Sequence, residues 1–152
     1  MSTLETEMLE IGRRARAAAH ALRLISSDER TAALRVIAAR LHAQARAIVS
    51  ANDADVGAAE RNGLGATQID RLRLNEERAV ALAESVATIA AQRDPVGAIA
   101  EDWTRPNGLR IQRVRTPIGV IGMIFESRPN VAADAGALAL RSGNAVILRG
   151  GS

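Results

Sequence analysis

The fold class is most clearly indicated by residues 117–152, PIGVIGMIFESRPNVAADAGALALRSGNAVILRGGS. Residues 119–125 form a continuous apolar run, which is typical of a strand covered on both faces. Pro129 suits the first turn of a helix, and residues 131–144 read as a helix followed by its C-terminal stop. Residues 145–148 form a second short apolar run. Because one helix joins the two strands, we expect a parallel pair with a right-handed crossover.

Ligands of open α/β sheets bind beyond the carboxyl ends of the strands. Here those ends are Glu-Ser-Arg-Pro-Asn, residues 126–130, and Arg-Gly-Gly-Ser, residues 149–152. Two adjacent glycines allow backbone N–H groups to approach an anion. The alternative without a binding role is that the second strand ends in a glycine turn with a solvated Arg149. Gly119 and Gly122 do not form a G-x-G-x-x-G dinucleotide fingerprint.

Upstream of this unit the sequence is mainly helical. Apolar residues spaced three and four apart predict amphipathic helices over residues 4–25, 28–61 and 75–93. Ser26-Ser27-Asp28 supplies a break before the second helix and an N-cap for it, and we expect a kink near Asn52 within it. A short helical turn is expected over residues 67–72.

A hairpin is predicted between the helices and the final unit. Asn107-Gly108 lies between two β-prone runs, residues 99–104 and 109–116, and Asn-Gly between such runs is a strong hairpin signal. The fold class is therefore α/β: N-terminal helices, a β-hairpin, then the first strand-helix-strand of a parallel sheet. Two parallel strands alone make a poor sheet, so we expect an incomplete domain.

Composition narrows the function. The 152 residues contain no cysteine, which excludes disulfides, thiolate metal sites and thiol nucleophiles from this chain. All 20 basic residues are Arg, and the pI is near 11.0 at a net charge of +3. A high pI is a nucleic-acid signal, but 17 acidic residues are interspersed with the arginines, and we expect no nucleic-acid partner. His20 and His42 lack companion ligands, so no metal is expected, and no run is long enough to span a membrane.

Several blocks of the sequence resemble one family. They are Pro-Ile-Gly-Val-Ile-Gly from Pro117, Glu-Ser-Arg-Pro-Asn-Val from Glu126, Ser-Gly-Asn-Ala-Val-Ile-Leu-Arg-Gly-Gly-Ser from Ser142, Ile-Asp-Arg-Leu from Ile69, and Asp-Pro-Val-Gly from Asp94. Together they are similar to the γ-glutamyl phosphate reductase (glutamate-5-semialdehyde dehydrogenase) family of the aldehyde dehydrogenase superfamily. The resemblance covers the whole chain but only about the first third of the family's usual length.

The resemblance implies a division of the chain into three parts. Residues 1–97 would be the helical part of the cofactor domain. Residues 98–116 would be a hairpin of a bridging sheet through which the protein forms a homo-oligomer. Residues 117–152 would begin the Rossmann-like, aldehyde-dehydrogenase-type nucleotide-binding core.

The resemblance also implies a cofactor site. In the superfamily a basic residue at the second strand end contacts the adenosine ribose, and Arg149 takes that place, followed by Gly150 and Gly151. Ser152 stands where NAD-preferring members carry an acid, which favours NADP because Arg and Ser accommodate a 2′-phosphate. Backbone of the first strand end would line the cofactor. Its residues are Ile124, Phe125, Glu126 and Ser127.

An oxyanion-stabilising Asn of the superfamily falls on Arg128 rather than on Asn130. Either Arg128 binds the phosphate or carboxylate of the substrate, or Asn130 supplies an amide donor to the oxyanion. The alternative is that Ser127 and Asn130 only cap the following helix.

The implied reaction is reduction of L-glutamyl 5-phosphate to L-glutamate 5-semialdehyde and phosphate by NADPH, in cytoplasmic proline biosynthesis. An active-site cysteine forms a thioacyl intermediate in that reaction. Because this chain has no cysteine, we expect it to be the N-terminal part of the reductase and inactive alone. The competing hypothesis is a non-catalytic helical module that binds a protein partner or, through its arginines, nucleic acid.

Overall fold

The computed structural model describes residues 2–126 and 128–150. Its elements, in chain order, are α1 (Thr3–Leu22), α2 (Ser27–Ala43), α3 (Ala45–Arg61), α4 (Ala66–Leu72), α5 (Glu76–Ala91), β1 (Ile99–Thr104), β2 (Arg110–Val114), β3 (Val120–Ile124), α6 (Pro129–Arg141) and β4 (Ala145–Arg149). The α/β class and the order of helices, hairpin and strand-helix-strand unit are as the sequence predicts.

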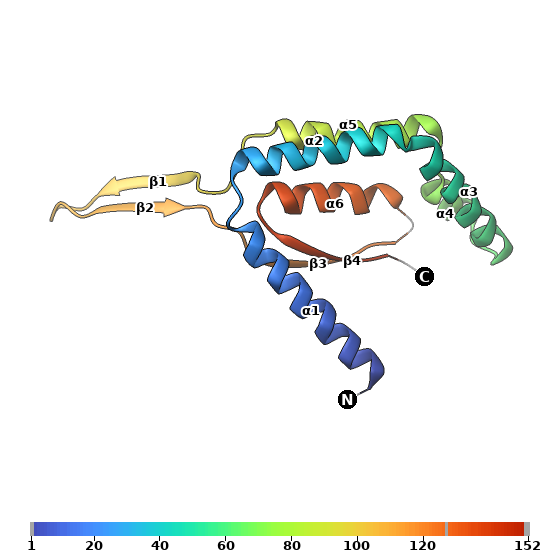
Figure 1. Ribbon diagram of the computed structural model, residues 1–152, viewed down its shortest axis with the longest axis horizontal. Coiled ribbons are helices and arrows are strands. Elements are labelled where there is room, and N and C mark those ends of the chain that lie inside the picture. The colour runs from blue at the N-terminus through green and yellow to red at the C-terminus, as the bar shows by residue number, and fades with distance from the viewer. Residues whose placement is uncertain (1, 127, 151–152) are drawn as a thin grey trace.

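The helices form layers around a two-stranded parallel sheet. Figure 1 shows α2 and α5 side by side on one side of α6, with β3 and β4 on the other side of α6. α1 crosses the opposite face of this strand pair and contacts both strands. Nothing in the described helices is long and apolar enough to cross a membrane.

The core lies where α2, α5 and α6 meet. Leu34 of α2 and Val86 of α5 are fully buried, and Ala137 of α6 packs with them. The core residues are all aliphatic, as a chain with one Trp, one Phe and no Tyr requires. Alanines at the contacts let the helices approach closely, because a methyl group occupies little of the space between them.

The second predicted helix is two helices, and the predicted kink at Asn52 is wrong. The break falls at Gln44, which ends α2 and begins α3 with a φ of −101°. Asn52 lies inside α3 and is 5% exposed. Its amide donates to the Leu72 carbonyl at 2.9 Å and accepts from the Leu74 N–H at 2.6 Å. The polar residue that suggested a kink therefore ties α3 to the segment joining α4 and α5.

Capping residues fix where the helices begin. The Ser26 hydroxyl accepts from the Glu29 N–H at 3.2 Å, and the Glu29 carboxylate accepts from the Ser26 N–H at 2.7 Å. This reciprocal pair confirms the predicted break and cap before α2. Asn75 caps α5 by accepting from the Arg78 N–H. Pro129 occupies the first turn of α6, as predicted.

A buried polar cluster joins α2, α6 and the segment after α5. Arg30, with a side chain 5% exposed, donates to Asp94 at 2.6 Å and to the Ile25 carbonyl at 2.6 Å. Arg141 of α6 donates to the Thr31 hydroxyl at 2.7 Å and to the Gln92 carbonyl. Within the described part of the chain the Nε atoms of both arginines have no hydrogen-bond partner. The cluster holds the end of α5, and so the base of the hairpin, against α2 and α6.

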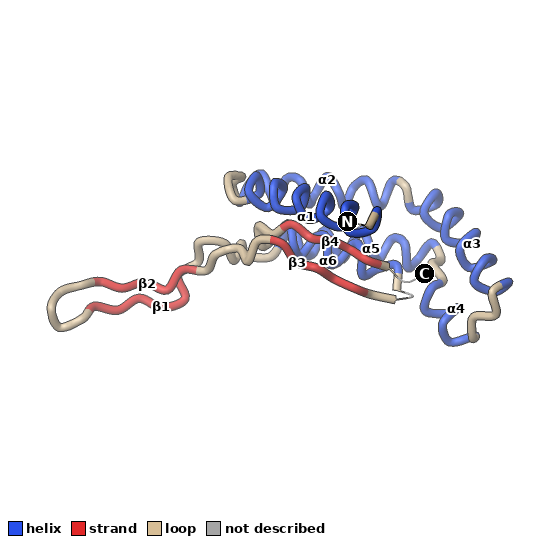
Figure 2. The backbone as a smooth tube through the Cα atoms, turned by 90° about the horizontal axis from the view of Figure 1, so that it is seen from below, coloured by secondary structure: helices blue, strands red, loops and turns tan. Residues whose placement is uncertain are grey.

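The hairpin of β1 and β2 projects from the helical body. Trp103 pairs with Ile111 and Thr104 with Arg110, and Gly108 in the turn has a φ of +82° that suits glycine. Figure 2 shows the hairpin extending away from the other elements. Every residue of β1 is exposed. The contacts inside the hairpin are therefore made in solvent.

β3 and β4 form the predicted parallel pair, with Val120 opposite Ala145 and Ile124 opposite Arg149. The expectation of full burial on both faces is wrong, because Val120 is 37% and Ile124 is 80% exposed. In the described residues this sheet has only these two strands, so no further strand covers the outer edge of either one.

The start of the sheet is fixed by the turn after α6. Asn144, 4% exposed, accepts a hydrogen bond from the Gly119 N–H at 2.8 Å. Gly143 has a φ of +71°, and a Cβ there would lie 2.9 Å from the Pro117 ring. Only glycine fits that backbone and that contact. The helix stop read from the sequence is therefore also what aligns the two strands.

Candidate functional site

The carboxyl ends of β3 and β4 lie side by side. The Phe125 N–H donates to the Arg149 carbonyl at 3.0 Å, which extends the pairing of Ile124 with Arg149 by one step. Gly150 lies against the Phe125 ring, since a Cβ on Gly150 would be 3.8 Å from the ring Cζ. The two strand ends that the sequence singled out are thus brought together.

The predicted site residues divide between two depressions in the surface. Phe125, Glu126 and Gly150 line one of them, Asn130 lines the other, and Arg128 lines both. Arg149 ends β4, is exposed and lines neither, and Ile124 is exposed beside it. The predictions for Ser127, Gly151 and Ser152 lie outside the described residues.

We call the first depression the strand-end groove. It has a volume of about 650 Å³ and lies between α3, the segment before α5, and the loop after β3. Its α3 wall includes Asn52 and Asp55, and its other wall carries Phe125 and Gly150. An apolar ring beside a glycine backbone gives this groove a surface on which a flat ligand group can lie.

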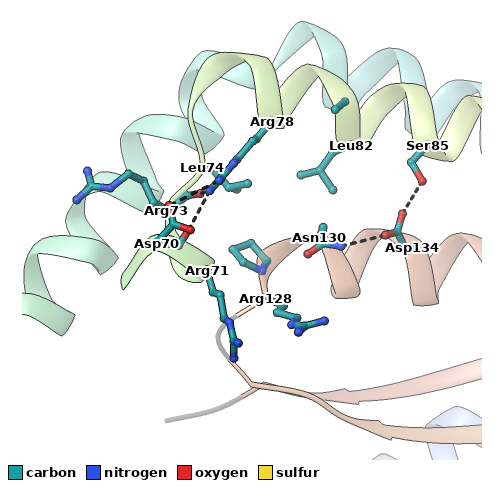
Figure 3. Close-up of a pocket in the computed structure, with 12 residues that line it drawn as sticks. Asp70, Arg71, Arg73, Leu74, Arg78, Leu82, Ser85, Arg128, Asn130 and Asp134 are labelled. Carbon is teal, nitrogen blue, oxygen red and sulfur yellow. Dashed lines mark hydrogen bonds and ion pairs between the residues drawn. The ribbon is translucent and has the colours of Figure 1, made fainter. Parts of the chain in front are cut away.

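We call the second depression the α5–α6 pocket. It has a volume of about 470 Å³ and lies between α4, α5 and the first turns of α6. Figure 3 shows its side chains. Arg78 organises one wall, because its guanidinium donates to the carbonyls of Asp70 and Arg73 at 2.9 and 2.8 Å. Arg73 is in turn paired with Glu60 at 3.1 Å.

The α6 wall of this pocket carries the carboxylate of Asp134. Asp134 accepts from the Ser85 hydroxyl at 2.7 Å and from the Asn130 amide at 3.3 Å, and both bonds are visible in Figure 3. The alternative in which Asn130 caps α6 is wrong, because Arg128 is the N-cap and Asn130 lies within the helix. Asn130 holds Asp134 in place across one turn.

Two of the four arginines that line the pocket have no ion-pair partner among the described residues. Among the described residues, neither Arg71 nor Arg128 takes part in an ion pair. The N-terminus of α6 adds the partial positive charge of the helix dipole. A pocket that presents both guanidinium groups and a fixed carboxylate is able to bind a ligand that carries charges of both signs.

Sequence reasoning missed Asp70, Arg71, Ser85 and Asp134 as candidates. Asp70 and Arg71 belong to the Ile-Asp-Arg-Leu block, which carries the family resemblance but no chemical signal of its own. The four-residue spacing of Asn130 and Asp134 was a usable signal. The contact of Ser85 with Asp134 joins residues 49 apart in sequence, and nothing local predicts it.

Comparison with known proteins identifies relatives along nearly the whole chain. No family model matches it. A γ-glutamyl phosphate reductase from Allorhizobium ampelinum is 54% identical over 149 residues, which are 98% of this chain and 35% of that protein. γ-Glutamyl phosphate reductases from Brucella suis and Brucella anthropi are also 54% identical, over 95% of this chain.

Solved structures agree with these relatives. The crystal structure of γ-glutamyl phosphate reductase from Thermotoga maritima matches with a TM-score of 0.89 at 42% identity, covering 95% of this chain and 35% of that one. The Saccharomyces cerevisiae enzyme matches with a TM-score of 0.89 at 37% identity, covering 94% of this chain and 36% of that one. The chain thus spans about a third of the length of the proteins it matches.

Proposed function

We propose that this chain supplies the cofactor-binding part of a γ-glutamyl phosphate reductase. The reason is that it matches the N-terminal part of such enzymes over almost all its length. The reaction is reduction of L-glutamyl 5-phosphate by NADPH to L-glutamate 5-semialdehyde and phosphate. The observation that carries the proposal is 54% identity over 98% of the chain, together with the same fold.

The strand ends fit a nicotinamide cofactor. Gly150 has no Cβ to obstruct a ligand beside Phe125, and the exposed guanidinium of Arg149 is available for an anion. We assign Arg149 to the 2′-phosphate, which makes NADP the cofactor. We assign the backbone of the loop after β3 to the lining of the cofactor site. When bound, the cofactor supplies the hydride.

The residues of this chain bind and orient, and they do not carry out covalent catalysis. No thiol is present, so the thioacyl intermediate cannot form on this chain. Arg128, at the junction of the groove and the pocket, is placed to bind an anionic part of the substrate. We therefore expect turnover only when these residues are joined to the part of the enzyme that carries the cysteine.

Self-association through the hairpin is part of the proposal, as is a cytoplasmic location. Ile99, Trp103 and Val114 are large apolar residues exposed on β1 and β2, and both outer edges of this hairpin are unpaired in the described structure. Unpaired strand edges pair readily with another chain. Light scattering over a range of concentrations should show oligomers, and a monomer at high concentration would contradict this part.

A chimera tests the function. The matched region of the Allorhizobium ampelinum reductase is replaced by this chain, and NADP reduction is measured with glutamate 5-semialdehyde and phosphate. We expect the chimera to be active at a rate comparable to the parent enzyme and the 152-residue chain to be inactive. A folded chimera that binds no cofactor, or turnover by the chain alone, would refute the proposal.

Arg149→Glu in the chimera tests the cofactor assignment. The change removes a charge-assisted contact to the 2′-phosphate and adds a repulsion, so NADPH affinity should fall about tenfold to a hundredfold. NADH binding should fall less. Arg35→Glu, an exposed charge reversal on α2, is the control. Equal losses of NADPH and NADH affinity would show that Arg149 does not contact the phosphate.

A further inference from the structure

The α5–α6 pocket carries charged side chains that are not among the residues assigned to the cofactor. It opens beside the loop after β3, where Arg128 lines both the pocket and the strand-end groove. A ligand in the pocket therefore lies next to whatever occupies the groove. A volume of about 470 Å³ is within the range of small-molecule sites.

The charges of the pocket walls are asymmetric once internal pairs are set aside. Arg73 is bound by Glu60, and Arg78 holds Asp70, so these residues shape the wall without needing a ligand. Among the described residues, Arg71 of α4 and Arg128 at the start of α6 line the pocket without an ion-pair partner. Asp134, further along α6, is held in place by Ser85 and Asn130.

We propose that the α5–α6 pocket binds the α-amino-acid end of the glutamyl substrate. Arg71 and Arg128 contact its α-carboxylate, and Asp134 contacts its α-ammonium group. A guanidinium group matches a carboxylate in shape and charge, and a fixed carboxylate is the natural partner of an ammonium group. The identity of the ligand rests on the proposed function, whereas the recognition of an α-amino acid rests on the pocket alone.

Three commercially available compounds separate the two charges. L-Glutamate carries both α groups, glutarate lacks the ammonium group, and 4-aminobutyrate lacks the α-carboxylate. Each is titrated into the isotope-labelled 152-residue chain, and backbone amide shifts are followed at the pocket residues Leu82 and Ser85. L-Glutamate should bind at least tenfold more tightly than either analogue, because each analogue loses one charge-assisted contact.

Two variants assign each charge to its residue. Asp134→Asn should weaken L-glutamate about tenfold and leave glutarate unchanged. Arg71→Gln should weaken L-glutamate and leave 4-aminobutyrate unchanged. Each variant thus removes one of the two preferences, a result that a general loss of structure cannot produce.

Two controls guard against structural effects. Arg73→Gln removes a guanidinium of the same pocket that Glu60 already holds, and it should change no affinity. Ser85→Ala keeps the Asp134 charge but removes its anchor, so L-glutamate should still bind more tightly than glutarate. If Asp134→Asn does not fold, the comparison of the three ligands on the unmodified chain and on Arg71→Gln still decides the proposal.

Equal binding of the three compounds, or no shift at the pocket, would overturn the inference. These outcomes are distinguishable from failure of the proposed function. If the chimera has no reductase activity while L-glutamate still binds selectively here, the pocket is an amino-acid site, but the protein to which it belongs is not this reductase. If the chimera is active and the pocket is silent, the substrate's amino-acid end is bound elsewhere.

Discussion

Two Arg–Asp pairs with similar contact distances occupy opposite environments in this molecule. In the helical body, Arg30 meets Asp94 at 2.6 Å, with side chains 5% and 13% exposed. In the hairpin, Arg110 meets Asp102 at 2.5 Å, with side chains 67% and 33% exposed. Contact distance alone therefore says little about how much a pair contributes to stability. What matters is whether water can replace the partner when the contact is broken.

The pKa values show the same contrast from another side. Burial alone would raise the pKa of the Asp94 carboxyl, but hydrogen bonds from Ser27, from Arg30 and from the backbone outweigh it and hold the pKa below its usual value. Hydrogen bonds from Arg110 and Gln112 lower the pKa of Asp102 to about 2. The larger change in pKa thus belongs to the exposed Asp102 carboxyl. Solvent and salt screen its interactions there, so this change contributes less to stability than its size suggests.

Breaking the buried pair should have the largest effect. Asp94→Ala leaves the Arg30 guanidinium buried and unpaired, and we expect a loss of about 3–5 kcal/mol in the free energy of unfolding. Urea denaturation of the 152-residue chain measures it. The double variant Arg30→Met with Asp94→Leu should recover much of the loss, because it removes both charges. A small effect of Asp94→Ala would mean that water reaches the site.

A substitution in the apolar core gives a loss in the free energy of unfolding with which the effect of Asp94→Ala can be compared. Leu34 is fully buried between α2 and α5, and Leu34→Ala should cost about 3 kcal/mol through lost burial and the cavity left behind. Val36→Ala, on the exposed side of the same helix, is the matched control and should be nearly neutral. If Leu34→Ala cost much more than Asp94→Ala, packing rather than the buried pair would dominate the body.

A smaller effect is expected at the start of α2. Ser26→Ala removes the hydroxyl that accepts from the Glu29 N–H and should cost about 1 kcal/mol, measured by urea denaturation. Ser26→Asp keeps an acceptor at the cap and should cost little. An equal loss in both variants would indicate that the cap is not what stabilises this end of the helix.

The smallest effect should come from the exposed pair. Both aspartates have lowered pKa values, so each contributes stability above the ordinary value of 3.8 and loses it as pH falls through its folded-state pKa. In 1 M salt the Asp102 contribution should vanish and that of Asp94 should persist. Asp102→Asn should therefore change the acid limb of unfolding only in low salt. A salt-resistant change would show that the hairpin is covered, for example by a second copy.

The sequence predicted the elements well where a pattern is local. The apolar run at β3, Pro129 at the start of α6, and Asn107-Gly108 at the hairpin each depend on neighbouring residues. The break at Gln44 was missed because glutamine is a good helix former and gives no stop signal. Asn52 was misread because its partners, Leu72 and Leu74, lie 20 and 22 residues away.

The candidate site was predicted only in outline. The rule that ligands bind at strand ends points to Phe125, Arg128 and Gly150, which line the strand-end groove, because the rule follows from topology. The α5–α6 pocket could not be predicted, since it exists only when α4, α5 and α6 pack together. Arg71 and Asp134 look like ordinary surface charges on two separate helices until the fold places them around one cavity.

The buried polar cluster of Arg30 and Arg141 also has a consequence for the order of assembly during translation. The hydrogen bond between Asn144 and Gly119 joins residues 25 apart. In contrast, the partner of Arg30 is synthesised 64 residues later, and Arg141, the partner of Thr31, 110 residues later. The ribosome therefore releases α2 well before anything can neutralise or cover Arg30. We expect the N-terminal helices to remain loosely associated until α6 emerges, and then to lock together in one step. Nascent chains stalled before residue 141 has left the ribosomal exit tunnel should be protease-sensitive at α2, and chains stalled after it has emerged should not.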